Sequence, residues 1–339
     1  MKKILVILTG GTIGSKNDDT SINTDKASAY NLIKLYYSKY GTENLFEVIQ
    51  PLNILSENMN LKNLSVFCKA ISDIDLKMYK GIIITHGSDT LSYTSALIGM
   101  IYNFTDIPIL ITASNYTLTD KRSNGLENFR SCITFINNSD IAGIFVIYQD
   151  SNKRNNIYIS TRVQEADPYF DQFSAFGNGL YGYISENKIT VNNSDFNNKI
   201  PKKISFESPV IFQNDILLIR PYPGMNYKNI DLSNKPAAVL HYLYHSATGS
   251  NENGKYSLTE FIDRCHMYGI DVYTASYKDI TSTMYDTAKC IVDSGAVPMI
   301  NISCEAAYMK LMLAYNQKQY QPSYIINQNI YYEHGSSLI

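Results

Sequence analysis

The sequence predicts an α/β fold in which helices cover a largely parallel sheet. Short apolar runs alternate with helix-length periodic segments, and polar, glycine-containing loops follow the ends of the apolar runs. With 339 residues, 45% of them hydrophobic, the chain can bury a large core and form two domains. Parallel sheets bind ligands beyond the carboxyl ends of their strands, so functional residues are expected in those loops.

The first half of the chain contains the clearest elements. Apolar runs predict strands, and segments with a helical period predict the helices between them. The predicted strands are Lys3–Leu8, Gly81–Thr85, Ile107–Thr112 and Ile141–Tyr148, and the predicted helices are Leu61–Ile71 and Thr90–Asn103.

A polar, asparagine-rich stretch between residues 187 and 203 interrupts this pattern and predicts a linker. We therefore expect an N-terminal catalytic α/β domain over residues 1–190, a linker over 191–209 and a C-terminal α/β domain over 210–339. The alternation of strands and helices resumes after the linker. The predicted strands are Ile216–Arg220, Ala237–Tyr244 and Ile270–Ala275, and the predicted helices are Ser257–Tyr268, Tyr285–Ser294 and Cys304–Tyr315.

Charge and cysteine content limit the function classes. A formal net charge of -2 without a long run of like charge gives no footprint for a nucleic acid or an anionic membrane, which favours a small-molecule partner. The opening apolar run Ile4–Leu8 is too short to span a membrane and lacks the cleavage pattern of a signal peptide. Five widely spaced cysteines without a C-x-x-C pair suggest neither a disulfide framework nor a zinc knuckle. We expect a soluble cytoplasmic protein without a cofactor.

Two histidines in the second half have the spacing of a helical metal-binding pair. His241 and His245 lie, however, in a segment that predicts a strand, where four residues span about 13 Å. One metal ion cannot bridge that distance, so no metal site is expected.

The first loop with chemical potential is Thr9-Gly10-Gly11-Thr12-Ile13-Gly14, directly after the first predicted strand. Its glycines allow the backbone to turn sharply and to approach a ligand, which leaves the Thr12 hydroxyl at the strand end. The alternatives are an ordinary glycine-rich turn or a phosphate loop. Neither of the common phosphate-binding glycine motifs is present.

The second loop is Thr85-His86-Gly87-Ser88-Asp89-Thr90, between a predicted strand and a predicted helix. A hydroxyl and a carboxylate close to free backbone N–H groups can orient a charged substrate and stabilise an oxyanion. The same residues also suit a capped helix start with Ser88 or Asp89 as the N-cap, and this segment alone favours neither interpretation. We expect His86 to be a packed, hydrogen-bonded residue of the loop.

Together the two loops resemble the two signature segments of the bacterial-type L-asparaginases, which are threonine amidohydrolases. Further segments resemble that family in the family's order along the chain. They are Ser56-Glu57-Asn58-Met59, Thr112-Ala113-Ser114-Asn115 with Arg122-Ser123-Asn124-Gly125 and Asn128, and Ser294–Met299 with Glu305-Ala306-Ala307 and Lys310-Leu311. The resemblance implies a two-domain asparaginase-like fold, with a parallel-rich sheet flanked by helices in the larger N-terminal domain and a smaller C-terminal α/β domain.

The resemblance also implies a reaction. A threonine hydroxyl attacks the side-chain amide of L-asparagine, ammonia leaves, and water hydrolyses the acyl-enzyme to release L-aspartate. Thr12 matches the nucleophile, Ser88 matches a second hydroxyl, and Asp89 matches the carboxylate that holds the substrate's α-amino group. The implied substrate-binding positions are Ser56, Glu57, Gly11, Gly87 and Ser114.

Three departures from the family pattern fall within this apparatus. Ser88 replaces a threonine. The segment from Tyr158 to Val163 resembles the family's lysine-bearing strand end but contains no lysine, and Arg162 is the nearest candidate. Arginine stays protonated, so Arg162 can supply positive charge but cannot act as a base.

The third departure concerns the family's loop tyrosine. The predicted loop from Gly14 to Ala29 has no tyrosine, and Ile22 falls at the matching position, which leaves Tyr30 as the candidate.

Two functions remain open. One is hydrolysis of L-asparagine; the other is a catalytically impaired or substrate-shifted homologue that binds an amino-acid-like ligand or acts on a modified or peptide-linked asparagine. In either case the resemblance implies a homodimer or homotetramer.

Overall fold

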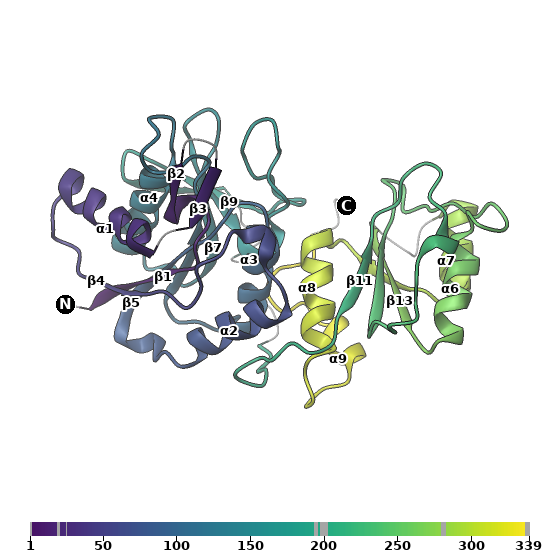
Figure 1. The fold of residues 1–339 in the computed structure, drawn as a ribbon. Helices are drawn as coiled ribbons and strands as arrows, with labels where there is room; N and C mark the ends of the chain where they lie inside the picture. Colours follow the sequence, from purple (N-terminus) through teal and green to yellow (C-terminus); the bar gives the residue numbers. More distant parts are fainter. Residues whose placement is uncertain are drawn as a thin grey trace.

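The computed structural model describes residues 2–18, 21–24, 26–192, 196, 203–278 and 283–335. It contains an eight-stranded mixed sheet of order β10-β9-β8-β7-β6-β5-β1-β4, and a four-stranded parallel sheet of order β11-β12-β13-β14. Helices pack against both sheets (Figure 1), so the predicted two-domain α/β fold is confirmed.

The first sheet and its helices account for the chain up to residue 191. In chain order the elements are β1 (Lys3–Leu8), η1 (Thr12–Gly14), β2 (Ser15–Asp18), β3 (Ser21–Thr24), α1 (Lys26–Tyr40), β4 (Phe46–Ile49), η2 (Ser56–Asn58), α2 (Leu61–Ser72), η3 (Leu76–Met78), β5 (Tyr79–Thr85), α3 (Leu91–Ile101), β6 (Pro108–Thr112), α4 (Gly125–Asn138), β7 (Gly143–Gln149), β8 (Asn155–Ile159), η4 (Ser160–Arg162), β9 (Leu180–Ser185) and β10 (Lys188–Val191).

The second sheet and its helices follow. They are β11 (Ile216–Ile219), η5 (Tyr227–Asn229), β12 (Ala238–Tyr242), α6 (Leu258–Met267), β13 (Asp271–Tyr277), α7 (Asp286–Asp293), β14 (Val297–Ile300), α8 (Cys304–Ala314) and α9 (Pro322–Ile326).

The predicted strands and helices are all present, and their ends differ from the prediction by no more than two residues. β1, β5, β6 and β7 are buried along almost their whole length because helices cover both faces of the sheet, and their near-continuous apolar sequences suit that environment. Their packing creates the first core, which is extended by α1, α2, α3 and α4.

Two segments differ from the sequence-based expectation. The region from Gly14 to Ala29, expected as a loop, instead contains an antiparallel hairpin of β2 and β3 and the start of α1; its residues 19–20 and 25 lie outside the described residues. The polar stretch that begins at residue 187 starts with β10, which pairs with β9. Residues 193–195 and 197–202 of the expected linker also lie outside the described part of the chain.

The connections of the first sheet use both of its faces. α1 and α4 pack together on one face, through Tyr36 and Phe129 among others, whereas α2 and α3 share a second cluster on the other face. The connection β6-α4-β7 runs in the same direction along the sheet as β5-α3-β6 but crosses the opposite face. The two crossovers therefore have opposite hands. The units β1-α1-β4, β4-α2-β5 and β5-α3-β6 share one hand, which is the usual right hand, so β6-α4-β7 is the left-handed crossover.

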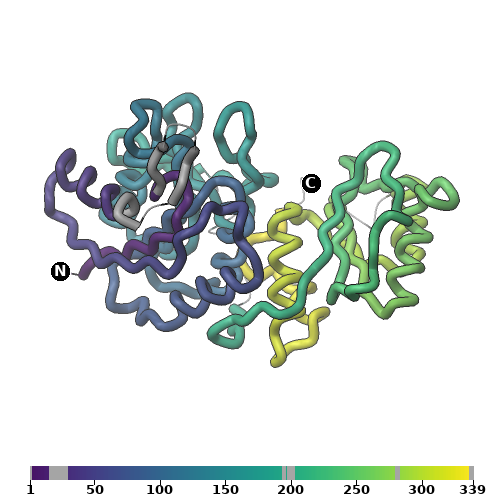
Figure 2. Tube along the Cα trace, viewed as in Figure 1, coloured from purple at the N-terminus to yellow at the C-terminus, as the bar shows by residue number. Residues whose placement is uncertain are grey.

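The second domain is joined to the first through α8 and α9. These helices lie between α3 and the four-stranded sheet (Figure 1) and form a shared apolar cluster with α2, α3, β11 and β13. The C-terminal segment then returns to the first core, where Tyr331 is buried and its hydroxyl accepts a hydrogen bond from the N–H of Ile144 (2.5 Å). In Figure 2 the yellow region of the trace that contains α8 and α9 lies between the two domains.

Candidate functional site

The loops that follow β4, β1 and β5 meet at the carboxyl edge of the first sheet. The N–H of Gly11 donates to the carbonyl of Ile54 (2.9 Å), and both the N–H and the hydroxyl of Thr9 donate to the carbonyl of Thr85 (3.2 and 2.9 Å). The chain leaves β1 toward one face of the sheet and leaves β5 toward the other, as α1 and α3 show. Such a switch point is where open α/β sheets bind ligands.

The backbones at this edge approach too closely for side chains. Gly11 has a φ of +71°, and a Cβ there would lie 2.5 Å from the Cα of Gly87. A Cβ on Gly87 would lie 2.5 Å from the hydroxyl oxygen of Ser56. Glycine is therefore required at both positions, and three loops predicted from separate motifs form one continuous surface.

Polar side chains of the second signature loop surround this contact. The hydroxyl of Ser56, which is buried, lies 3.5 Å from the carboxylate of Asp89, and the hydroxyl of Thr90 donates to the carbonyl of Ser56 (2.9 Å). The side chains of Glu57 and Asp89 are exposed, so their carboxylates face solvent where a ligand can reach them. The sequence analysis assigned no role to Thr90, although it is the last residue of the second loop motif.

The structure also separates the two interpretations of the second loop. The N-cap of α3 is Thr90, and its side chain makes no capping hydrogen bond. Ser88 and Asp89 precede the helix, so the interpretation of either one as the N-cap is wrong. Their hydroxyl and carboxylate lie just before the helix, where the positive end of its dipole favours an anionic group.

His86 holds the same loop in place from its buried side. Its backbone N–H donates to the carbonyl of Thr112 (2.8 Å), and its Nδ1 lies 2.8 Å from the carbonyl of Gly87, a geometry that requires the Nδ1–H tautomer. Complete burial lowers the pKa of His86, so the imidazole is neutral near pH 7. The ring therefore orients Gly87, as expected of a packed loop residue.

Thr12 is the first residue of η1, directly after Gly11, and its side chain is partly exposed. The loops thus place the hydroxyls of Thr12 and Ser56 and the exposed carboxylates of Glu57 and Asp89 around the contact between Gly11 and Gly87. The family model "Asparaginase, N-terminal" matches residues 3–197, which is more than half of the chain and includes all of these loops.

The chain belongs to the asparaginase family.

Asparaginase-family hydrolases are similar to this chain over nearly its whole length. The L-asparaginase of Thermococcus kodakarensis is 24% identical over 314 residues, which is 92% of each chain. A glutamyl-tRNA(Gln) amidotransferase subunit of Methanobrevibacter smithii is 26% identical over 327 residues, or 91% of this chain and 71% of that protein.

Solved asparaginase structures have the same fold. The thermostable L-asparaginase from Thermococcus kodakarensis superposes with a TM-score of 0.80 at 22% identity, covering 99% of this chain and 100% of the other. L-asparaginase I from Vibrio cholerae superposes with a TM-score of 0.78 at 21% identity, covering 99% of each chain. The implied two-domain asparaginase fold is therefore confirmed.

Arg162, the candidate for the asparaginase lysine, is directed toward the C-terminal segment. It is buried, and its guanidinium donates to the carbonyls of Tyr332 (2.5 Å) and His334 (2.6 Å). These bonds anchor the returning segment to η4. In this position Arg162 is a structural element of the domain junction, and its catalytic role stays a prediction.

Two other predicted site residues have different surroundings from the central loops. The hydroxyl of Ser114 is buried and hydrogen-bonds to the carbonyl of Tyr116 (2.5 Å) and the hydroxyl of Ser123 (2.9 Å), so it organises its own loop. Tyr30 lies on α1, which packs against η1, and its side chain is exposed. No contact shown by the described residues joins either one to Thr12.

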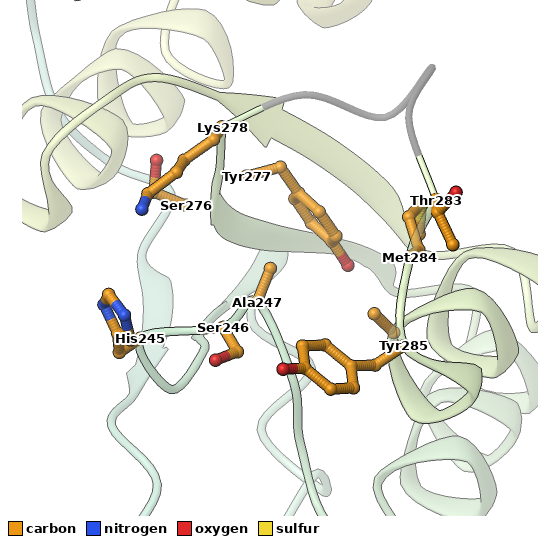
Figure 3. Close-up of a pocket in the computed structure, with 10 residues that line it drawn as sticks. His245, Ser246, Ala247, Ser276, Tyr277, Lys278, Thr283, Met284 and Tyr285 are labelled. Atoms are coloured by element: carbon orange, nitrogen blue, oxygen red, sulfur yellow. The ribbon is translucent and has the colours of Figure 1, made fainter. Parts of the chain in front are cut away.

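A separate hollow lies in the second domain (Figure 3). It occupies about 230 Å³ beyond the carboxyl ends of β12 and β13, beside the start of α7, and His245, Tyr277 and Tyr285 line it. His241, by contrast, is buried in β12 and bonds through Nε2 to the hydroxyl of Tyr227 (2.9 Å).

In the part of the chain that the structure describes, no helix combines the length and apolar character needed to cross a membrane.

Proposed function

We propose that this chain hydrolyses the side-chain amide of L-asparagine to L-aspartate and ammonia, with Thr12 as the nucleophile. The observation that supports this most strongly is the contact of Gly11 with Gly87 and of Gly87 with Ser56, which brings the hydroxyl and carboxylate loops together. The L-asparaginase relatives support the choice of substrate. We propose that the enzyme works as a cytoplasmic homodimer or homotetramer, as the resemblance implies.

The proposed roles follow from the chemistry of each group. Asp89 binds the α-amino group of the substrate, and Ser56 and Glu57 bind its α-carboxylate and amino ends. The Thr12 oxygen attacks the amide carbon, and backbone N–H groups near the start of α3 stabilise the oxyanion that forms. The proton of the Thr12 hydroxyl passes to the amide nitrogen, which leaves as ammonia, and water then cleaves the ester to release L-aspartate and restore the Thr12 hydroxyl.

Replacing Thr12 by alanine tests this proposal. We expect ammonia release from L-asparagine to fall by about 10⁴-fold or more, because the attacking oxygen is gone. The control is Thr259→Ala, which removes the same atoms from the start of α6 in the second domain. Equal rates for wild type and Thr12→Ala would contradict the proposal, and a thermal-unfolding curve would show that both variants fold.

A second candidate is a homologue that binds an amino-acid-like ligand but turns it over weakly or acts on a modified or peptide-linked asparagine. The placement of Arg162 at the domain junction favours it, because no cation of the segment from Tyr158 to Val163 is then left for the reaction. Heat of binding from L-asparagine without ammonia release in the wild type would support this candidate.

A further inference from the structure

A polar cluster of three side chains joins the two domains beside α3. The hydroxyl of Tyr93 donates to the carboxylate of Glu165 (2.6 Å), and Arg220 donates two hydrogen bonds to the same carboxylate (3.0 Å each). Arg220 also lies 3.3 Å from the Tyr93 hydroxyl. Each residue comes from a different element: Tyr93 from the first turn of α3, Glu165 from the segment after η4, and Arg220 from the end of β11.

The cluster is fixed further by α8. The N–H of Glu165 donates to the carboxylate of Glu305 (3.1 Å), which is buried in the first turn of α8. The guanidinium of Arg220 lies 3.9 Å from that carboxylate. The permanently protonated guanidinium of Arg220 therefore lies beside one partly exposed carboxylate and one buried carboxylate, and burial raises the pKa of the buried one, Glu305.

This cluster adjoins the loop that carries Asp89. A cavity of about 370 Å³ separates α3 from β11, and both Thr90 and Tyr93 line it, together with Ile216 and Leu218 of the second domain. Thr90 also holds the carbonyl of Ser56. The only hydrogen bond that the described residues show for the Asp89 side chain is the long one from Ser56 (3.5 Å), so the position of Asp89 depends on the helix that follows it.

We propose that Tyr93, Glu165 and Arg220 are positioning residues that set substrate affinity. By tying the first turn of α3 to the second domain, they fix Asp89 at the distance from Thr12 that an amino-acid substrate requires. This inference rests on the proposed function. A cluster that only held the two domains together would affect stability alone. Weakening a positioning cluster also raises KM, because Asp89 binds the substrate in the ground state as well as in the transition state.

The test compares Glu165→Gln and Tyr93→Phe with a matched variant. Glu165→Gln keeps the shape of the side chain but removes its charge, and Tyr93→Phe removes only the hydroxyl. The control is Glu127→Gln, because Tyr40, Glu127 and Arg130 form a second Tyr-Glu-Arg cluster on the opposite face of the first sheet, with distances of 3.4 and 2.8 Å. Steady-state ammonia release and thermal unfolding are measured for each.

We expect KM for L-asparagine to rise about 10-fold or more in Glu165→Gln and Tyr93→Phe, with kcat within about 3-fold of wild type. Glu127→Gln should keep the wild-type KM. The double variant should be little worse than either single variant, because the two groups act as one unit. Arg220→Lys, which keeps the charge but loses the paired hydrogen bonds, should be intermediate.

The inference is overturned if wild type and all cluster variants share one KM while the cluster variants only unfold at lower temperature. A wild type that shows no Thr12-dependent ammonia release would instead refute the proposed function, and the inference with it. The two failures are therefore distinguishable in one set of assays.

Discussion

Replacing Lys310 by methionine should lower the free energy of unfolding by about 3–5 kcal/mol, because it leaves a buried carboxylate without its cation. The ammonium of Lys310 is fully buried and donates to Glu333 (2.8 Å) and to Nε2 of His334 (2.8 Å), as well as to the carbonyl of Gln328. Burial opposes the ionisation of Glu333, but Lys310 and backbone N–H groups outweigh it and lower the pKa of Glu333 to about 2.

This ion pair anchors the C-terminal segment. Glu333 accepts hydrogen bonds from the N–H groups of Ile330 and Tyr331, and Tyr331 fills part of the first core. We therefore expect Lys310→Met to loosen the segment from the first domain as well as to destabilise the chain. Denaturant unfolding measures the loss of stability, and hydrogen exchange at residues 330–335 measures the loosening.

Two comparisons make this prediction specific. The exposed pair Lys69 and Asp73, at 3.0 Å, should contribute only about 0–1 kcal/mol, so Lys69→Met is the matched control. The double variant Lys310→Met with Glu333→Gln should recover part of the loss, because no unpaired charge is then buried. A Lys310→Met protein within about 1 kcal/mol of wild type would contradict the anchoring role.

Replacing Gly11 by alanine should sharply reduce activity, because the added methyl group has no space in the site. The new Cβ would lie 2.5 Å from both the N and the Cα of Gly87, and neither backbone atom can move without displacing Ser88 and Asp89. We expect hydrolysis of L-asparagine to fall about 10²-fold or more, since displacements of about 1 Å have such effects in active sites. Steady-state kinetics measures the loss.

Gly269 provides a control with the same backbone conformation. Its φ is also +71°, but a Cβ there would have no neighbour within 4 Å, so Gly269→Ala adds only the strain of the left-handed region. We expect this variant to lose about 1–2 kcal/mol of stability at most and to keep its activity. Equal activity of Gly11→Ala and Gly269→Ala would contradict the close approach of the two loops.

The sequence predicted the parts of the fold that depend on local pattern. β1 and β5 are continuous apolar runs because both faces of the central sheet are covered, and the loops after them carry glycines that their close approach requires. β10 was missed because an edge strand in solvent can be polar: in Lys188–Val191 most side chains are exposed. The hairpin of β2 and β3 is likewise polar in sequence.

The candidate site was predictable only where single segments carry it. The motifs placed Gly11, Gly87 and Ser56 in loops that the structure brings together. Arg162 was a candidate because of its position in the chain, but its partners are carbonyl groups 170 and 172 residues later. The contact of Arg220 with Tyr93 spans 127 residues and leaves no local signal in the sequence.

The central claim is that one amino acid binds between the Thr12 and Asp89 loops, and a crystal structure of the protein with L-aspartate tests it most directly. We predict that the α-amino group of the ligand lies within hydrogen-bond distance of Asp89 and that its side-chain carboxylate lies against the Thr12 hydroxyl. L-Aspartate bound elsewhere, with the space between these loops empty at a saturating concentration, would contradict the claim.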